Sequence, residues 1–351
     1  MVERDPPEGL VLHANAVPVH GANRSVILDL QAQRIHSIPG AFTPALRLLE
    51  EARGRPLPEL GAAQSPEERA RLIALASWLE ERGLAARTRH PERFPALNLA
   101  WRHPGPIYSA VVDLDADSRH DLAALSASLV GLGCVWLTLR LAMDQAGARL
   151  EPLLEALGDA PLNLEIQLAA WPDPDLDALR ALLRARPRIA RLTLFGAAER
   201  RVVQAPPSGF GGIHLAPEPL RLDEARAPDR EQMGVTLEQA AIARDYNLSL
   251  YKAVAIDTAG RIKNTVGPAP AFGQLPEDPL EDVVRRADFQ AAWAWHKGLI
   301  AGCDRCELRR CCADPRWPVR GEDGALRYTS DCAYDPESGR WRDAARPPER
   351  P

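Results

Sequence analysis

The order of apolar and polar positions predicts a small module of strands followed by helices in the first part of the chain. Strands are predicted at Leu10–Val19, Ser25–Leu30 and Arg34–Ile38. One helix is predicted at Thr43–Glu51. A second begins at Ser65, where a capping serine, a proline and two glutamates mark a helix start, and it ends at Gly83. Residues 10–90 are therefore predicted to form a winged-helix-like module.

Apolar runs of strand length alternate with apolar stripes of helical spacing in the middle of the chain. The strand-like runs are Ile107–Leu114, Cys134–Leu139, Leu162–Leu168, Ile189–Phe195 and Ile213–Ala216. The helical stripes are His120–Leu132, Leu150–Leu157 and Leu176–Ala185. This order is typical of a parallel sheet covered by helices. Because the segment is too short for a closed eight-unit barrel, residues 105–245 are predicted to form a partial barrel or an open α/β sheet.

The last region, residues 246–342, is predicted to be a small domain with little regular structure. Val254–Asp257 and Arg261–Lys263 flank a Thr-Ala-Gly sequence and predict a tight hairpin. An amphipathic helix is predicted from Leu280 to about Ile300, followed by a segment rich in cysteine. Small loop-rich regions need staples to be stable, and a metal site supplies one.

Charge and composition restrict the partners more than the fold. The chain of 351 residues has a formal net charge of −5, with 46% hydrophobic and 26% charged residues. This balance argues against broad binding of nucleic acid or of anionic membranes. Neither a signal peptide nor an apolar run of about 18 residues is visible, so we expect a cytoplasmic protein. In that compartment, clustered cysteines are more often metal ligands or catalysts than disulfides.

Four cysteines near the end of the chain have the spacing of a metal-ligand set. Cys303 and Cys306 are separated by two residues, and Cys312 and Cys332 follow. The two-residue spacing lets both thiolates point at one ion or cluster. We predict a metal centre at these four residues. Zinc and an iron–sulfur cluster both stay open, because four thiolates suit either one.

The neighbours of this set have predicted roles as well. Nearby arginines are expected to lower the thiol pKa values and to offset the charge of a ligated cluster. They are Arg305, Arg309, Arg310 and Arg316. Cys311 is predicted to be a spare thiol, because adjacent residues rarely face one metal. Cys134 lies in an apolar run and is predicted to be a small buried residue.

Other polar residues are weaker candidates for a site. Three aspartates alternate after the first strand of the middle region, namely Asp113, Asp115 and Asp117. Such carboxylates bind divalent cations, but a solvated acidic turn with Ser118 as a helix cap is the favoured interpretation. Arg140 is predicted at the same face, to contact a phosphate or carboxylate or to pair with those aspartates. His214 and His296 are single histidines, for which packing or surface roles are expected.

The chain resembles the SPASM-domain peptide maturases of grasp-with-spasm gene systems from about residue 10 to residue 342. The matching stretches are Val17–Ser25, Asp29–Gln31, Ile256–Asn264, Phe272–Gly273, Cys303–Cys312 and Cys332–Pro336. Such proteins accompany an ATP-grasp ligase and a ribosomally made precursor peptide. The first module of this chain is similar to elements that bind a leader peptide as an added strand, and a plain winged-helix packing domain is the alternative that stays open. The resemblance therefore implies a precursor peptide and an ATP-grasp ligase as partners.

SPASM domains typically carry two auxiliary iron–sulfur clusters, and the resemblance implies that this chain keeps one. Cys303, Cys306, Cys312 and Cys332 match one complete ligand set, which implies a single 4Fe–4S cluster. The places of the other set hold Leu248, Thr265 and Pro315 or Arg316, which implies that the second cluster is lost. Radical S-adenosylmethionine enzymes also carry a C-x3-C-x2-C trio after their first barrel strand. Residues 114–118 contain no cysteine, so the resemblance implies a degenerate, non-radical domain.

These expectations combine into an α/β chain with three parts: a winged-helix-like recognition module, a partial (β/α) barrel and a small SPASM-like four-cysteine domain. The predicted function is the maturation of a ribosomally made peptide, by a protein that binds the precursor without radical chemistry. Two alternatives stay open. One is a redox enzyme that modifies a peptide through its cluster, and the other is a zinc-stapled peptide-binding protein.

Overall fold

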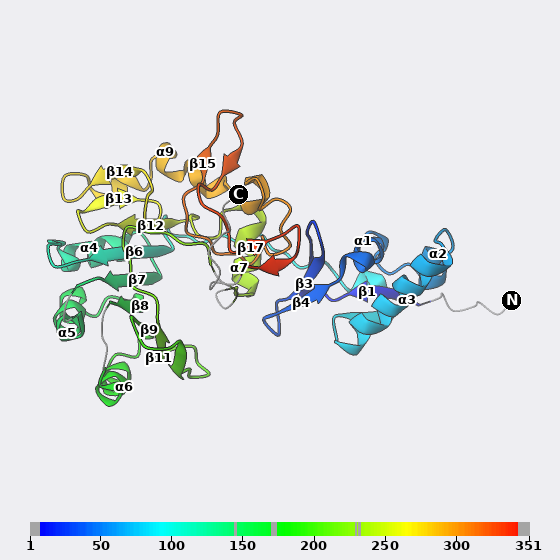
Figure 1. Cartoon of the computed structure of the whole chain (residues 1–351), viewed down its shortest axis with the longest axis horizontal. Helices are drawn as coiled ribbons and strands as arrows, with labels where there is room; N and C mark the ends of the chain where they lie inside the picture. Colours follow the sequence, from blue (N-terminus) through cyan, green and yellow to red (C-terminus); the bar gives the residue numbers. More distant parts are fainter. Residues whose placement is uncertain (1–7, 144–145, 170–173, 229, 231–232, 343–351) are drawn as a thin grey trace.

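The computed structural model describes residues 8–143, 146–169, 174–228, 230 and 233–342. A large, mostly parallel sheet of nine strands lies at one end of an elongated molecule, and a smaller module with three helices lies at the other end (Figure 1). The cysteine-containing region lies between them. The chain is thus a mixed α/β protein. Within the described ranges, no helix is long and apolar enough to cross a membrane.

The nine-stranded sheet is built mainly from strands that are consecutive in the chain. In spatial order its strands are β10 (Arg201–Gln204), β11 (Gly212–Ala216), β9 (Ile189–Phe195), β8 (Asn163–Leu168), β7 (Trp136–Leu141), β6 (Ser109–Leu114), β12 (Ala253–Ile256), β13 (Arg261–Lys263) and β14 (Ala271–Gln274). From β6 to β9 the parallel strands follow one another without a reversal. Right-handed crossovers then place the connecting helices on one face. The sheet ends in antiparallel strands at both edges and is open, not a closed barrel.

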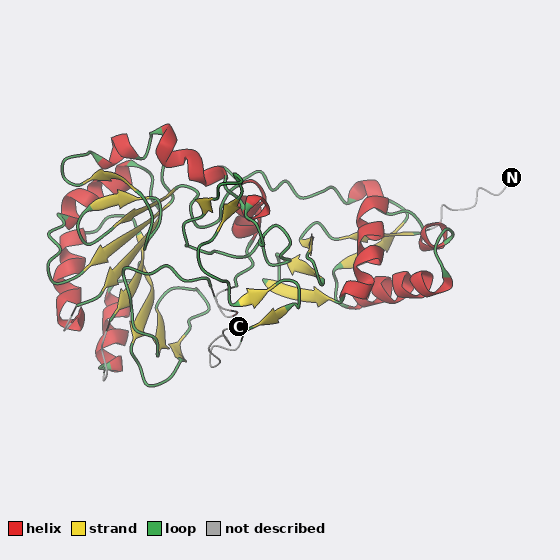
Figure 2. Ribbon diagram, turned by 45° about the horizontal axis from the view of Figure 1, so that its top comes forward, coloured by secondary structure: helices red, strands yellow, loops and turns green. Residues whose placement is uncertain are grey.

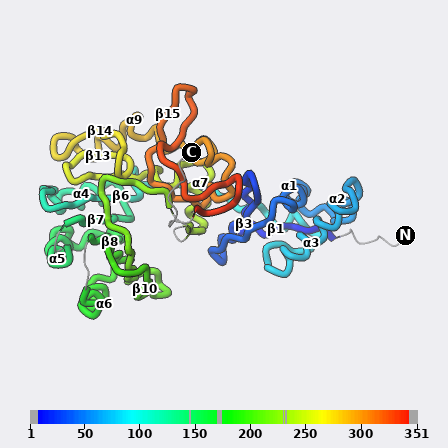
Figure 3. Tube along the Cα trace, viewed as in Figure 1, coloured from blue at the N-terminus to red at the C-terminus, as the bar shows by residue number. Residues whose placement is uncertain are grey.

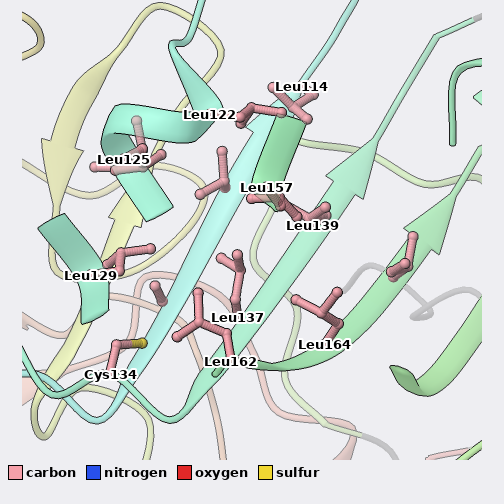
Figure 4. Packing of buried hydrophobic residues seen from close by; sticks show 14 of the residues in the cluster. Leu114, Leu122, Leu125, Leu129, Cys134, Leu137, Leu139, Leu157, Leu162 and Leu164 are labelled. Atoms are coloured by element: carbon pink, nitrogen blue, oxygen red, sulfur yellow. The ribbon is translucent and has the colours of Figure 1, made fainter. Parts of the chain in front are cut away.

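Helices α4 (Leu122–Gly131), α5 (Ala146–Leu157) and α6 (Leu176–Ala185) lie along one side of this sheet (Figure 2). Every second residue of the central strands is buried beneath them, as in Leu137, Leu139 and Leu141 of β7. The leucines of α4 and the strands interlock in a single core (Figure 4). Cys134 belongs to this core, which confirms its prediction as a small buried residue.

The first module contains two small sheets and three helices. Strand β1 (Gly9–Leu12) pairs with β5 (Ala85–Thr88), whereas β2 (Ala16–His20), β3 (Ser25–Asp29) and β4 (Arg34–Ile38) form an antiparallel sheet. The helices are α1 (Thr43–Ala52), α2 (Leu57–Gly61) and α3 (Pro66–Glu81). The start of α3 is confirmed, because Ser65 and Glu68 form a reciprocal capping box. The single strand predicted over Leu10–Val19 is wrong: the chain turns after β1 and continues in a different sheet.

The central strand β3 of the sheet β2–β3–β4 is buried on both faces. Alternate residues such as Ile27 and Ile38 pack against the helices of the first module. The intervening residues, including Val26 and Leu28, pack against the cysteine-containing region. All five residues of β3 are consequently buried, without the polar face that an antiparallel sheet often shows to water. The first and the last parts of the chain therefore share one core, and their traces lie side by side in Figure 3.

The last hundred residues differ most from the prediction. The hairpin β12–β13 is confirmed, but it continues the nine-stranded sheet because β12 pairs with β6. The long helix predicted from Leu280 to about Ile300 is wrong. Two short helices, α8 (Leu280–Val283) and α9 (Ala287–Gln290), and two 3₁₀ turns (Ala291–Ala294 and Lys297–Leu299) replace it. Arg286 is extended between the helices, and this bend lets apolar residues of both pack into the core of the large sheet.

Three further elements frame the cysteines. Helix α7 (Leu237–Asp245), which was not predicted, starts with a capping box at Thr236 and packs into the shared core. Two short hairpins follow the cysteine-rich turns. They are β15 (Val319–Arg320) with β16 (Leu326–Arg327), and β17 (Tyr334–Asp335) with β18 (Arg340–Trp341).

Candidate metal centre

The first three cysteines of the predicted set lie on consecutive turns, and the fourth precedes β17. The turns begin where the amide of Cys303 donates to the carbonyl of Ile300 at 3.0 Å, and the amide of Cys306 donates to the carbonyl of Cys303 at 3.0 Å. Two sulfurs accept backbone amides. Leu308 N lies 3.4 Å from Cys306 Sγ, and Tyr334 N lies 3.4 Å from Cys332 Sγ. Amide donors at these positions stabilise a negatively charged sulfur.

The four thiols are close enough to affect one another electrostatically. Burial raises the pKa of the Cys312 thiol to about 12, and the neighbouring Cys303 and Cys332 add to this rise. Burial also raises the pKa of Cys306, again with contributions from Cys312 and Cys303. Desolvation raises the pKa of Cys303 and outweighs Arg316, which lowers it as expected. No arginine of the described residues is among the main contributors at Cys306 or Cys312, where burial also raises the pKa, so the expected lowering is wrong for these two thiols. A bound metal would replace the thiol protons and remove that penalty.

All six cysteines are free thiols in the structure. Within the described part of the chain, no three Cys, His, Asp or Glu side chains converge closely enough to hold a single metal ion. The buried Sγ of Cys311 donates to the carbonyl of Leu308 at 3.3 Å and packs in the shared core. Its role as a spare thiol stays a prediction.

A buried polar set borders the cysteines. Lys297, Asp314 and Arg316 are 2%, 1% and 5% exposed. Arg316 donates to both carboxylate oxygens of Asp314, at 2.7–3.2 Å, and Lys297 Nζ lies 3.5 Å from Asp314 Oδ2. Lys297 also donates to the Tyr328 hydroxyl, and the Arg316 guanidinium lies 4.2 Å from the centre of the Tyr328 ring. Although burial disfavours the charged form of Lys297, its pKa is raised by Cys312, Tyr328, Asp314 and Cys303.

Sequence reasoning identified Arg316 but missed Lys297 and Asp314. One signal was present: the chain has only three lysines, and Lys297 follows Trp293 and Trp295 in an otherwise apolar stretch. A lysine is rarely fully buried unless it is paired. In a chain where arginine supplies nearly all the positive charge, such a lysine is worth testing as part of a site.

A second contact joins the cysteine region to the turn between β2 and β3. Arg24 Nε donates to Glu307 Oε1 at 2.7 Å, and both residues contact the Tyr334 hydroxyl. The amide of Ala22 donates to the carbonyl of Arg305 at 2.8 Å. A Cβ at Gly21 would lie 2.7 Å from Glu307 Oε2, so only glycine permits this close approach. Glu307, the residue after Cys306, is thus fully buried beneath the turn.

The positions that the resemblance matched to a lost second ligand set are partly brought together. The Thr265 hydroxyl donates to the carbonyl of Pro315 at 2.7 Å, although fifty positions separate them in the chain. No thiol is present at either place. The contact shows that the loop after β13 packs directly on the segment after Cys312.

The remaining candidates lie elsewhere. Arg140 pairs with Asp113 through two hydrogen bonds of 2.6 and 2.7 Å, which confirms that it pairs with an aspartate of the acidic turn. Burial raises the pKa of Asp113 despite this partner. Asp113 lines a cavity of about 630 Å³ at the carboxyl ends of β6 and β12. Ser118 is not the helix cap: Ser118 instead donates to Asp115 within the turn, and Asp121 caps α4.

The two single histidines have local roles. His296 Nδ1 accepts the amide of Gly298 at 3.2 Å at the start of a 3₁₀ turn. His214 lies on β11, where burial and the nearby Arg191 lower its pKa.

Compared with known proteins, the sequence matches no family model and no curated protein.

Proposed function

We propose that this chain is a maturation protein for a ribosomally made peptide, which binds the precursor at β4 and holds one 4Fe–4S cluster at Cys303, Cys306, Cys312 and Cys332. One observation carries the proposal. The small sheet β2–β3–β4 lies between the helices of the first module and the cysteine turns, and its central strand β3 is buried on both faces. A peptide added to this sheet would therefore be fixed close to the cysteine centre.

The free edge of β4 supports the peptide-binding half of the proposal. In the described residues β4 pairs only with β3, and most of its residues are at least partly exposed. Its His36 faces Trp78 of α3, with the ring centres 6.0 Å apart. The buried His36 Nε2 atom has no hydrogen-bond partner among the described residues and lies 3.9 Å from Asp29 Oδ2. An open strand edge beside an aromatic side chain is an arrangement that suits strand addition, and we infer that the winged-helix-like module serves this purpose.

The chemistry of the donors supports the metal half. Desolvation and the neighbouring thiols raise the pKa of Cys303, Cys306 and Cys312, and a cation bound among these thiols would stabilise their ionised form. A 4Fe–4S cluster divides its four thiolates among four iron atoms, so it does not require three side chains to converge on one point. When bound, such a cluster supplies one-electron transfer or structural stability. We take residues 246–342 as the SPASM-like domain. Its Thr265 and Pro315, two of the positions matched to the second ligand set, contact one another without a thiol, which supports the loss of a second cluster.

The remaining parts of the proposal rest on the resemblance. Residues 105–245 would be a partial barrel that has lost the radical-cluster cysteines, in keeping with the consecutive parallel strands β6–β9. An ATP-grasp ligase would then make the modification on the presented peptide. Two alternatives remain. A zinc-stapled peptide-binding protein differs from the proposal in metal content, and a redox enzyme differs in that the isolated protein would turn over a peptide substrate.

Peptide binding can be tested with a displayed library of random 20-residue peptides, selected on the metal-loaded protein. Selected peptides are expected to protect residues 34–38 from hydrogen exchange and to bind at least about tenfold more weakly to Trp78→Ala, because anchor aromatics contribute about 2 kcal/mol or more. Trp136→Ala is the matched control, since Trp136 stacks on Phe210 at the other sheet. Peptides that protect other strands, or bind both variants equally, would refute the proposed site.

A further inference from the structure

The buried charges beside the cysteines do not balance. Lys297 and Arg316 are cations, and Asp314 is the carboxylate that both contact. One positive charge is therefore left without a partner inside this set. The side chains of Lys297 and Asp314 are only 3% and 2% exposed, so water screens them little. An unbalanced buried charge is costly unless a further group of opposite sign lies nearby.

The cysteines are the groups that can supply the missing negative charge. Lys297 and Arg316 both interact electrostatically with members of the set: Lys297 with Cys303 and Cys312, Arg316 with Cys303 and Cys332. Arg316 Nη1 also donates to the carbonyl of Asp331, the residue before Cys332, at 3.2 Å. Four thiolates around one zinc ion, or around a cluster core of charge +2, leave two negative charges. Neutral thiols leave none.

We propose that Lys297 and Arg316, held by Asp314 and Tyr328, are charge-compensating residues that stabilise the metal-loaded form of the four-cysteine centre and destabilise its metal-free form. This inference rests on the proposed function only for the existence of a metal centre. It holds for zinc and for an iron–sulfur cluster alike. Outer-shell partners of metal ligands commonly change metal affinity by about 10–100-fold.

The test uses the two opposite effects expected when Lys297 loses its charge: weaker metal binding and a more stable metal-free protein. In the metal-loaded protein, Lys297→Met is expected to speed metal loss to excess chelator by at least about tenfold. In the metal-free protein, the same change removes the excess positive charge of this set and leaves the neutral pair Asp314–Arg316. The urea concentration at the midpoint of unfolding is therefore expected to rise. A residue needed only for packing would lower both stabilities. If the centre is a cluster, its midpoint potential should also become more negative, because a cation that stabilises the reduced form is lost.

Lys263→Met is the matched control. Lys263 is also buried, with Nζ 3.1 Å from Asp257 Oδ2, but it lies on β13 in the large sheet. This variant is expected to lower stability equally with and without metal. Arg316→Met is a second variant with the same expected sign reversal, should Lys297→Met fail to fold.

The inference is overturned if both variants at the centre lose metal at the wild-type rate, or if they destabilise the metal-free and metal-loaded proteins alike. Its failure is distinguishable from failure of the proposed function. A wild-type protein that binds neither iron nor zinc refutes the metal centre itself. A wild-type protein that binds metal, with unaffected variants, refutes only the role of the charges.

Discussion

Replacing Cys306 with alanine is expected to release the metal from the protein almost completely. Cys306 is one of four predicted ligands, and its partly buried sulfur accepts the amide of Leu308 at 3.4 Å. A site that loses one of four thiolates loses one of the bonds that hold the metal, and the remaining three bind it more weakly. Anaerobic purification of the wild-type protein should yield about four irons and four sulfides per chain, with visible absorbance, and Cys306→Ala should yield almost none.

Two further cysteines serve as controls for this experiment. Cys311→Ala and Cys134→Ala should keep the wild-type metal content, because one thiol donates to Leu308 and the other lies in the core of the large sheet. One zinc per chain without visible absorbance would make the centre a structural staple and would remove the redox alternatives. A wild-type protein purified without iron or zinc would contradict the metal centre altogether.

Replacing Arg24 with alanine is expected to destabilise the protein by about 3 kcal/mol, because it leaves a fully buried carboxylate without its cation. That carboxylate belongs to Glu307. Its second oxygen, Oε2, has no hydrogen-bond partner in the part of the chain that the structure describes. The contact joins the turn after β2 to the residue after Cys306, so the loss should loosen the junction between the sheet and the cysteine turns. Urea unfolding measures the change in free energy, and hydrogen exchange of residues 16–29 locates it.

A salt bridge in the same region is a natural control. Arg305 pairs with Glu337 at 3.0 Å, but the two side chains are 62% and 56% exposed. Arg305→Ala should therefore change stability by no more than about 0.5 kcal/mol. In a double-mutant cycle, adding Glu307→Gln to Arg24→Ala should cost little more than the first change alone. Equal effects for Arg24→Ala and Arg305→Ala would show that the buried pair does not stabilise the junction.

The contacts between the cysteine turns and the turn after β2 connect the cysteine centre to the sheet β2–β3–β4. If metal binding orders the turns that carry Arg305 and Glu307, it also orders the turn at Gly21–Arg24, and through it the sheet whose free edge is β4. Peptide binding and metal binding would then stabilise one another, because each favours the same ordered junction. This coupling rests on the proposed function.

Local pattern determined a large part of the secondary structure. In residues 105–245 the apolar spacing is regular, and α6 and β9 have the predicted bounds. The start of α3 and the hairpin β12–β13 were also predicted, because a capping box and a tight turn depend on a few neighbouring residues. After Leu280 the apolar spacing is compatible with one amphipathic helix, but Arg286 is extended and divides the segment, which spacing alone does not reveal. There the prediction was wrong.

The sequence by itself determined the strand and helix order of the middle region, the four cysteines as candidate ligands and the absence of a radical-cluster trio. Only the tertiary structure decided that strand β3 is buried on both faces and that Lys297, Asp314 and Arg316 adjoin the cysteines. The reason is physical. Local spacing sets which face of an element is apolar, but it carries no information on what covers that face. Arg24 and Glu307 stand 283 positions apart, and their contact exists only because distant segments share one core.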